Sequence, residues 1–412
     1  MRPINVAITN NTGLRNRGCE ALVVSLMEGL QRNFEQPLDV MLQTNDPAFD
    51  KWRLQGVGNA MPSYLTLTPN HFSSIGFNKF VYACLSGMER LAPSQLGGYR
   101  VNQIKTLREA DLVLPTGGDI LTSDYGNLRK HLSSILAFKG KKAALVAHTI
   151  GPFKKDDEAY FKKSLDNVFL ITVRESESYE YLKSLNLDIP LHLTADVAFG
   201  LKPTSKEESK QFLKGRFGVD SDTSQLVALS VSEGVIRYSK LSRAQYFSEL
   251  TEFVRRLNAA GKVVLLIPHV MERNPNNNDL LACEELHAKL PDQSMCRIVA
   301  GEFTASQFKG IIGLTECLIG ARTHATIGSM SQAVPTVSIA YSRKAYGIMT
   351  DVFGPKLGPE LTLPATSLAA DALEAAYHRA MAEQSFAEVA VRMKALAETN
   401  YTLLKQHLPR IS

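Results

Sequence analysis

Residues 318–344 carry the pattern that most restricts the fold of this chain. Leu318 and Ile319 end a short apolar run that is typical of a buried parallel strand, and Gly320 then breaks this run. A helical pattern of apolar residues follows the loop, and a second apolar run, Thr336 to Ala340, predicts the next strand. A strand, a loop, a helix and a second strand in this order are typical of parallel α/β proteins.

Three cationic side chains follow the ends of these two strands. Arg322 and His324 lie in the loop after the first strand, and Lys344 follows the second. The carboxyl ends of parallel strands form the edge at which open α/β sheets bind ligands, and a helix that begins there adds N–H groups that suit an anion. Each residue alone would be typical of a solvated strand end or a helix cap. Together, the three favour a site for a small ligand with phosphate or carboxylate groups.

Strand and helix patterns alternate on both sides of a charged stretch at residues 203–224. The predicted strands cover residues 4–9, 111–115, 143–147 and 168–173 before this stretch, and 226–231 and 263–267 after it. Because 412 residues are too many for one compact core, we predict two parallel α/β domains. They are an N-terminal domain at residues 1–202, a linker region at 203–224, a C-terminal domain at 225–385, and a C-terminal helix at 386–412 that packs back toward the N-terminal domain.

The composition is that of an ordinary globular protein. Apolar residues make up 44% of the chain and charged residues 21%, which excludes a disordered chain. The net charge of +5 is not gathered into a basic run, so nucleic acid is not an expected partner. The residues at 1–9 do not have the pattern of a signal segment, and no apolar run approaches the roughly 20 residues of a membrane helix.

The cysteines predict a reducing compartment. Five of them are scattered along the chain without a C-x-x-C spacing, which favours a cytoplasmic protein with neither a disulfide framework nor a zinc site. They are Cys19, Cys84, Cys283, Cys296 and Cys317.

Residues 53–105 have no regular pattern. This stretch is rich in aromatic residues, proline and glycine, and its part from Ile75 to Leu91 mixes apolar with charged residues. We predict a pair of helices that pack on the sheet, with a peripheral membrane contact as an alternative role.

Polar loops follow several of the other predicted strands. Residues 10–18 lead from the first strand into a helix, but they match neither the dinucleotide nor the P-loop fingerprint. Glu20 at the start of that helix either complements the helix dipole or faces a ligand. Two glycines and Asp119 follow the strand at 111–115, which indicates a close approach of the backbone to a ligand or to another element. Arg174 repeats the theme of a basic residue at a strand end.

Four further residues near strand ends have more than one interpretation. His269 either satisfies backbone groups at a strand end or lines a ligand cleft. Asp196 and Asp279 are expected to anchor turns between the domains, and Glu233 is a weaker candidate for the cleft lining.

Eight stretches occur in an order that is specific although each one alone is weak. They are Asn16-Arg17-Gly18-Cys19-Glu20-Ala21, Gly117-Gly118-Asp119, Gly151-Pro152-Phe153, Val173-Arg174-Glu175, Ala195-Asp196, Pro268-His269, Gly320-Ala321-Arg322-Thr323-His324-Ala325, and Pro335 through Tyr341 to Lys344. In these stretches, and along almost its whole length, the chain resembles the polysaccharide pyruvyl transferase family.

The resemblance implies a fold, a reaction and a site. The fold would be GT-B-like, with two Rossmann-like domains that face each other across a cleft. The family transfers the enolpyruvyl unit of phosphoenolpyruvate onto a sugar of a cell-surface polysaccharide or its precursor, usually as a ketal that bridges two hydroxyls. By motif position, phosphoenolpyruvate would be bound by Arg174, Arg322, His324 and Lys344, and the acceptor by Asn16, Gly18, Glu20 and Asp119, to which we add His269.

The expected mechanism needs no cofactor and no metal, with phosphoenolpyruvate as co-substrate. Arg322 and Lys344 would bind the phosphate and Arg174 the carboxylate, or the reverse. His324 is the candidate general acid, because its ordinary pKa lies near working pH, and either Glu20 or Asp119 would accept the hydroxyl proton. The acceptor would be a sugar, free or lipid-linked, and the enzyme would work in the cytoplasm, with the inner face of the membrane as one location.

One position departs from the family pattern. Cys19 stands where many members have aspartate, so a role of that aspartate with acceptor protons would pass to Glu20 or the acceptor chemistry would differ. Two alternatives remain: a GT-B glycosyltransferase that uses a nucleotide sugar, and a non-catalytic relative that binds sugar or phosphate. Arg343 and Lys344 stand after Ala340, where a nucleotide-sugar enzyme would be expected to have acidic residues, and they favour a compact anion.

Overall fold

The fold is described from a computed structural model. The residues that it describes are 2–55, 64–69, 110–123, 128–136, 140, 142–239, 241–341 and 343–409; the side chains at 64–69, 130, 133–134, 136 and 343–344 are excluded. The pair of helices and the membrane contact that we predict within residues 53–105 therefore lie outside the described residues, apart from 53–55 and 64–69. Cys84 lies outside them as well.

The chain divides into two compact units. The first unit comprises Met1–Leu14, Leu22–Asp196 and Glu398–Ser412, and the second comprises Arg15–Ala21 and Val197–Ala397. The chain thus passes from one unit to the other after Asp196. The stretch at 203–224, predicted as a linker region, contains helix α8 (Lys206–Phe217), which packs on α12 (Ala305–Ile312) within the second unit.

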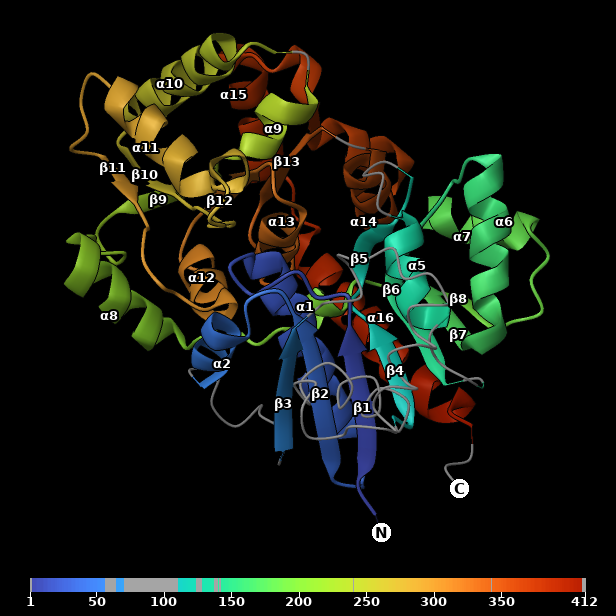
Figure 1. The fold of residues 1–412 in the computed structure, drawn as a ribbon. Coiled ribbons are helices and arrows are strands. Elements are labelled where there is room, and N and C mark those ends of the chain that lie inside the picture. The colour runs from blue at the N-terminus through green and yellow to red at the C-terminus, as the bar shows by residue number, and fades with distance from the viewer. Residues whose placement is uncertain are drawn as a thin grey trace. The chain divides into compact units, whose positions relative to one another are not determined.

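A parallel sheet forms the centre of the first unit. Its described strands are β1 (Ile4–Thr9), β2 (Leu38–Thr44), β3 (Tyr64–Pro69), β4 (Leu112–Pro115), β5 (Gly118–Leu121), β6 (Ala143–Ile150), β7 (Val168–Val173) and β8 (Leu191–Leu193). The order is β3-β2-β1-β4-β6-β7-β8, with β5 paired to β6, and β1 pairs β2 and β4 on its two sides (Figure 1). The helices are α1 (Arg17–Asn33), α2 (Pro47–Gln55), α5 (Leu128–Leu136), α6 (Lys155–Ser164) and α7 (Ser176–Ser184), and α1 begins in the second unit.

The second unit has the strand order of a Rossmann fold. Its described strands are β9 (Gln225–Ser230), β10 (Lys262–Leu266), β11 (Cys296–Ile298), β12 (Cys317–Gly320), β13 (Thr336–Ala340) and β14 (Thr362–Pro364), all parallel. Their order, β11-β10-β9-β12-β13-β14, corresponds to 3-2-1-4-5-6. The chain therefore reverses its direction across the sheet between β9 and β12, and the carboxyl ends of these two strands are where such folds bind ligands.

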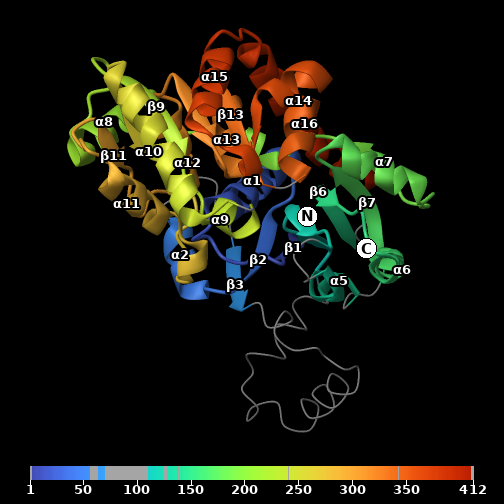
Figure 2. The ribbon, with the colours of Figure 1, turned by 90° about the horizontal axis from the view of Figure 1, so that it is seen from above.

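Helices cover both faces of this second sheet. On one side lie α10 (Arg243–Ala259), α11 (Asp279–Lys289) and α15 (Ala370–Met381), with α10 in contact with both of the others (Figures 1 and 2). On the other side, α12 packs on α8 and on α13 (Thr323–Met330). The remaining described helices are α9 (Glu233–Tyr238), α14 (Arg343–Glu360) and α16 (Phe386–His407), and α16 continues into the first unit from Glu398 on. Gly354, with φ +83, interrupts α14.

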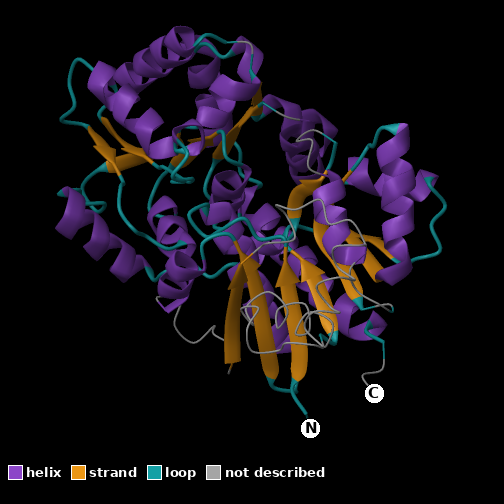
Figure 3. Cartoon of the chain, in the orientation of Figure 1, coloured by secondary structure: helices purple, strands orange, loops and turns teal. Residues whose placement is uncertain are grey.

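The apolar periods of the sequence explain these layers. The helical spacing of Tyr246, Phe247, Leu250, Phe253, Val254 and Leu257 places all six side chains in the core under α10. All residues of β13 are buried, as expected for an apolar run with parallel neighbours on both sides. The predicted fold class, two parallel α/β domains of Rossmann type, is confirmed (Figure 3). Among the described residues, no helix is both long and apolar enough to cross a membrane.

Candidate functional site

Arg322 lies at the carboxyl edge of the second sheet, next to the point where the strand order reverses. It directly precedes α13, where it holds the N-cap position. Its Nε donates to Oδ2 of Asp279 at 2.9 Å and its Nη2 to Oδ1 of Asp279 at 2.7 Å, and Nη2 also contacts Oδ1 of Asn277 at 3.3 Å. The guanidinium is therefore held in one orientation by a bidentate ion pair.

Asp279 connects three loops at this edge of the sheet. It is fully buried, and its carboxylate accepts hydrogen bonds from the backbone N–H of Val270 and, at 3.3 Å, of Glu233, in addition to those from Arg322. Burial lowers the pKa of Arg322, but the carboxylate of Asp279 and the hydroxyl of Tyr341 outweigh it and hold this pKa above its ordinary value. Asp279 was expected to anchor a turn between domains; within the second unit it orients Arg322.

A second buried ion pair joins the start of α1 to the start of α12. Arg17 is fully buried, and its Nη1 donates to Glu20 and its Nη2 to Glu302, both at 3.3 Å. The other carboxylate oxygen of Glu20 accepts the backbone N–H of Ala305 at 2.9 Å. Glu20, predicted as a catalytic and acceptor-binding residue, thus holds Arg17 and the first turn of α12.

The segment of residues 15–21 contacts the loop after β10 through its backbone. The N–H of Arg17 donates to the carbonyl of His269 at 3.0 Å, and the N–H of Met271 donates to the carbonyl of Arg15 at 3.1 Å. An isolated antiparallel bridge joins Asn16 to Val270 between these two bonds. Through these contacts the segment folds with the second unit.

Gly18 and His324 approach each other closely. A Cβ atom at Gly18 would lie 2.3 Å from Nδ1 of His324, a distance that no side chain can occupy. The side chain of Asn16 receives the backbone N–H of Gly18 at 2.9 Å and so shapes the turn. Two predicted groups, the acceptor residues Asn16 and Gly18 and the donor residue His324, are therefore neighbours.

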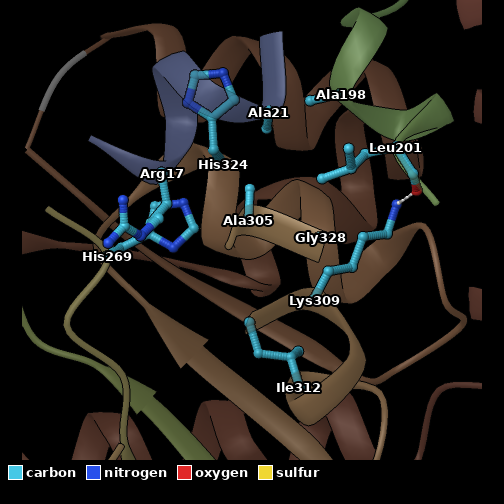
Figure 4. Close-up of a pocket in the computed structure, with 10 residues that line it drawn as sticks. All are labelled: Arg17, Ala21, Ala198, Leu201, His269, Ala305, Lys309, Ile312, His324 and Gly328. Atoms are coloured by element: carbon cyan, nitrogen blue, oxygen red, sulfur yellow. Dashed lines mark hydrogen bonds between the residues drawn. The ribbon is translucent and has the colours of Figure 1, made fainter. Parts of the chain in front are cut away.

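His269 and His324 line one small cavity of the second unit together with two buried cations. Figure 4 shows Arg17 beside His269 on one side of the cavity and Lys309 on the other, where its ammonium donates to the carbonyl of Leu201. His269 is 5% exposed. Burial, together with the nearby charges of His324, Arg322 and Arg17, holds the pKa of His269 well below its ordinary value, so this imidazole is neutral.

Three predicted site residues, Lys344, Asp119 and Arg174, are not among the described residues that line this cavity. Lys344 lies in the first turn of α14, which follows β13, but its side chain is outside the described part of the chain. Asp119 and Arg174 belong to the first unit, on β5 and directly after β7. Arg174 is buried and bonded to Asp196 and to the hydroxyl of Thr149. In that unit, Arg174 is already paired with a carboxylate.

Arg17 and Lys309 line the cavity but are not among the predicted site residues. Arg17 stands inside the motif of residues 16–21, and this position is the sequence signal that could identify it. Lys309 lies on the buried face of α12, and its spacing with Phe308 and Ile312 does not distinguish it from a solvated lysine. Among the described residues, no group of three or more His, Cys, Asp or Glu is arranged to hold a metal ion.

The chain is similar in sequence to a known protein family and to a known biosynthesis protein. The model of the polysaccharide pyruvyl transferase family matches residues 16–343. The amylovoran biosynthesis protein AmsJ of Erwinia amylovora is 22% identical over 374 residues, which are 87% of this chain and 88% of AmsJ.

Two solved structures share the fold at low sequence identity. The UDP-GlcNAc 2-epimerase of Methanocaldococcus jannaschii has a TM-score of 0.59 at 9% identity and covers 98% of this chain and 100% of its own. The glycotransferase of kitacinnamycin has a TM-score of 0.54 at 10% identity, and the match covers 99% of this chain and 100% of the glycotransferase chain. The GT-B-like fold class implied by the resemblance is thereby confirmed.

Proposed function

Because the chain belongs to the polysaccharide pyruvyl transferase family, whose members are transferases that modify polysaccharides, we propose that it uses phosphoenolpyruvate. In this proposal it moves the enolpyruvyl unit onto hydroxyls of a sugar in a cell-surface polysaccharide or its precursor. The products are a pyruvate ketal and phosphate.

The observation that supports this proposal most directly is the meeting of two motifs within the second unit. Gly18, in the motif of residues 16–21, lies against the imidazole of His324, and Arg322 lies two residues before His324 at the carboxyl edge of the sheet. This brings an imidazole and an oriented guanidinium to the beginning of one helix, where N–H groups favour an anion.

The charges suit a donor with several negative groups. Phosphoenolpyruvate carries about three negative charges near neutral pH, and Asp279 holds the guanidinium of Arg322 in one orientation at the carboxyl edge of the sheet. Lys344, at the end of the adjacent strand β13, supplies the second cation for the phosphate in this proposal. We assign the carboxylate to Arg174, as the resemblance implies, and this assignment is a prediction.

His324 then transfers the proton that starts the reaction. It protonates the methylene carbon of phosphoenolpyruvate, and the first sugar hydroxyl attacks the neighbouring carbon as its own proton leaves to a base. The bond between this carbon and the phosphate ester oxygen then breaks, and phosphate leaves with the oxygen and the electron pair. The second hydroxyl attacks the same carbon and closes the ketal. Of the two hydroxyl protons, one replaces the proton given to the methyl group and the other leaves with phosphate. Glu20 and Asp119 are the candidate bases.

The test combines binding with turnover. His324→Gln removes the acid and keeps a polar side chain of similar reach, so we expect kcat to fall by about 100-fold or more while calorimetry shows phosphoenolpyruvate bound nearly as in the wild type. His378→Gln, at an exposed histidine of α15, is the matched control. Unchanged kcat in His324→Gln would remove this residue from the mechanism.

The same calorimetric titration discriminates the alternative function. A glycosyltransferase of this fold would bind a nucleotide sugar and not phosphoenolpyruvate. Binding of UDP-sugars to the wild type with no heat from phosphoenolpyruvate would overturn our proposal in favour of that alternative.

A further inference from the structure

We propose that His269 holds one water molecule in the cavity that it shares with His324, and that this water positions the His324 imidazole. The inference deepens the proposed function and rests on it for the role of His324. His269 is then a positioning residue, because it acts on the reacting atoms only through another group.

The side chain of His269 is the starting point. Both of its ring nitrogens are buried, and neither has a hydrogen-bond partner among the described residues. Buried polar groups in proteins are almost always hydrogen-bonded, to protein or to ordered water. A buried imidazole with two unpartnered nitrogens therefore indicates a small polar ligand within reach.

Backbone contacts fix the main chain at His269, and its ring is buried in the second unit. The carbonyl of His269 receives the N–H of Arg17, and the ring packs near Phe308, with 6.5 Å between the ring centroids. Val270, the next residue, is bound by the carboxylate of Asp279 and bridged to Asn16. Since His269 is buried with its ring near Phe308, a partner for the ring nitrogens must lie inside the second unit.

The cavity has room for a single water molecule. Its volume is about 10 Å³, close to what one water requires, and far too small for phosphate or a sugar. His269, His324 and Arg17 bring polar groups to its wall, which meets the two to four partners that a buried water needs.

The charge state of His269 suits such a bridge. Because its pKa lies well below the ordinary value, one ring nitrogen carries a proton and the other accepts one. A water can donate to the accepting nitrogen and place its oxygen toward a neighbouring donor. His269 thereby supports the general acid without competing for its proton.

The test uses two variants of different hydrogen-bonding capacity. His269→Phe keeps the ring volume and removes both nitrogens, whereas His269→Gln keeps an amide that can bind water. With phosphoenolpyruvate and a sugar acceptor, we expect kcat to fall about tenfold to hundredfold in His269→Phe, since misplaced catalytic groups cost this much. The KM for phosphoenolpyruvate should stay within about twofold in both variants, and His269→Gln should recover most of kcat. The exposed His378→Phe is the matched control.

Nitrogen-15 spectra of the histidines give a readout that packing alone would not move. The signals of His324 should shift in His269→Phe and return toward their wild-type positions in His269→Gln. Equal losses of kcat in both variants with unchanged His324 signals would show a packing role and overturn the proposal. So would wild-type kcat in His269→Phe.

A crystal structure of the wild type at high resolution separates this inference from the proposed function. Water density within hydrogen-bond distance of a His269 nitrogen supports the water site even if phosphoenolpyruvate gives no turnover, in which case only the proposed function fails. Clear density for the ring without any such water would overturn the inference while turnover stands.

Discussion

Gly18 leaves no room for a side chain beside the imidazole of His324. A methyl group there would collide with Nδ1 of His324 at 2.3 Å, and the imidazole would have to move. The identity of this residue is therefore set by close approach to His324 and not by its own backbone conformation, since its φ is not in the left-handed region.

Gly18→Ala should lower kcat strongly and the free energy of unfolding only moderately. We expect kcat to fall by about 100-fold, because a displacement of about 1 Å has this effect on catalysis, with a loss of about 1–3 kcal/mol in unfolding free energy from overpacking. Gly215→Ala in α8 is the matched control, because its Cβ meets no atom within 4 Å. Steady-state kinetics with urea unfolding measures both effects, and wild-type kcat in Gly18→Ala would contradict the close approach.

Asp279 offers a second prediction at this scale. Asp279→Asn removes the charge that faces the mostly buried Arg322, so we expect a loss of about 3–5 kcal/mol in unfolding free energy. Glu360→Gln, which breaks the exposed pair with Arg379, should cost less than about 1 kcal/mol. Urea unfolding followed by circular dichroism compares the two. Equal small losses would mean that Asp279 is not the anchor of Arg322.

The start of α12 shows how an element is assembled from distant segments. Thr304 and Gln307 form a capping box in which each side chain accepts the other residue's backbone N–H. Glu20, from a segment 285 residues earlier in the chain, accepts the N–H of Ala305. Local sequence thus supplies one part of the cap, and the fold supplies the other.

Substitutions at this helix start should have unequal costs. Thr304→Ala removes a local N-cap, and we expect the free energy of unfolding to fall by about 1 kcal/mol. Glu20→Gln can still accept the N–H of Ala305, but it removes the buried negative charge that faces the fully buried Arg17, so we expect a loss of about 3 kcal/mol in unfolding free energy. Adding Arg17→Met to Glu20→Gln should restore part of the stability in urea unfolding. A cost below about 1 kcal/mol for Glu20→Gln would contradict this view of the ion pair.

The elements themselves follow from local sequence, whereas their partners do not. The apolar run at 336–340 and the helical spacing in α10 predict a buried strand and an amphipathic helix, and both are confirmed. The bond between Arg322 and Asp279 joins residues 43 apart because β10 and β12 both flank β9. Strand order cannot be read from periodicity, so Asp279 as the partner of Arg322 was not predicted. The packing of residues 15–21 on the loop after β10 depends on the same long-range arrangement.

At the scale of the whole molecule, each unit contains a buried neutral histidine near the carboxyl end of a strand. In the first unit, His148 on β6 is fully buried, and its Nε2–H contacts the carbonyl of Pro115 at 3.3 Å. Burial lowers the pKa of His148 to about 3, with the charge of Arg174 acting in the same direction. His269 is its counterpart in the second unit. Both units must therefore lose stability when histidines become protonated on unfolding.

The sign and the pH window follow from the pKa of His148. Below a pH of about 6.5, the ordinary pKa of histidine, the unfolded chain binds a proton at His148 that the folded chain excludes. The free energy of unfolding therefore decreases as the pH is lowered from about 6.5 to about 3, by roughly 1.4 kcal/mol per pH unit. Between pH 7 and pH 5, His148 should contribute a loss of about 2 kcal/mol, and His148→Gln should remove that part. Trp52, the single tryptophan, lies in the first unit with His148, so its fluorescence in urea reports on the relevant unit. His378→Gln should leave the pH dependence unchanged, and an equally steep loss in His148→Gln would show that His148 is not excluded from protonation in the folded protein.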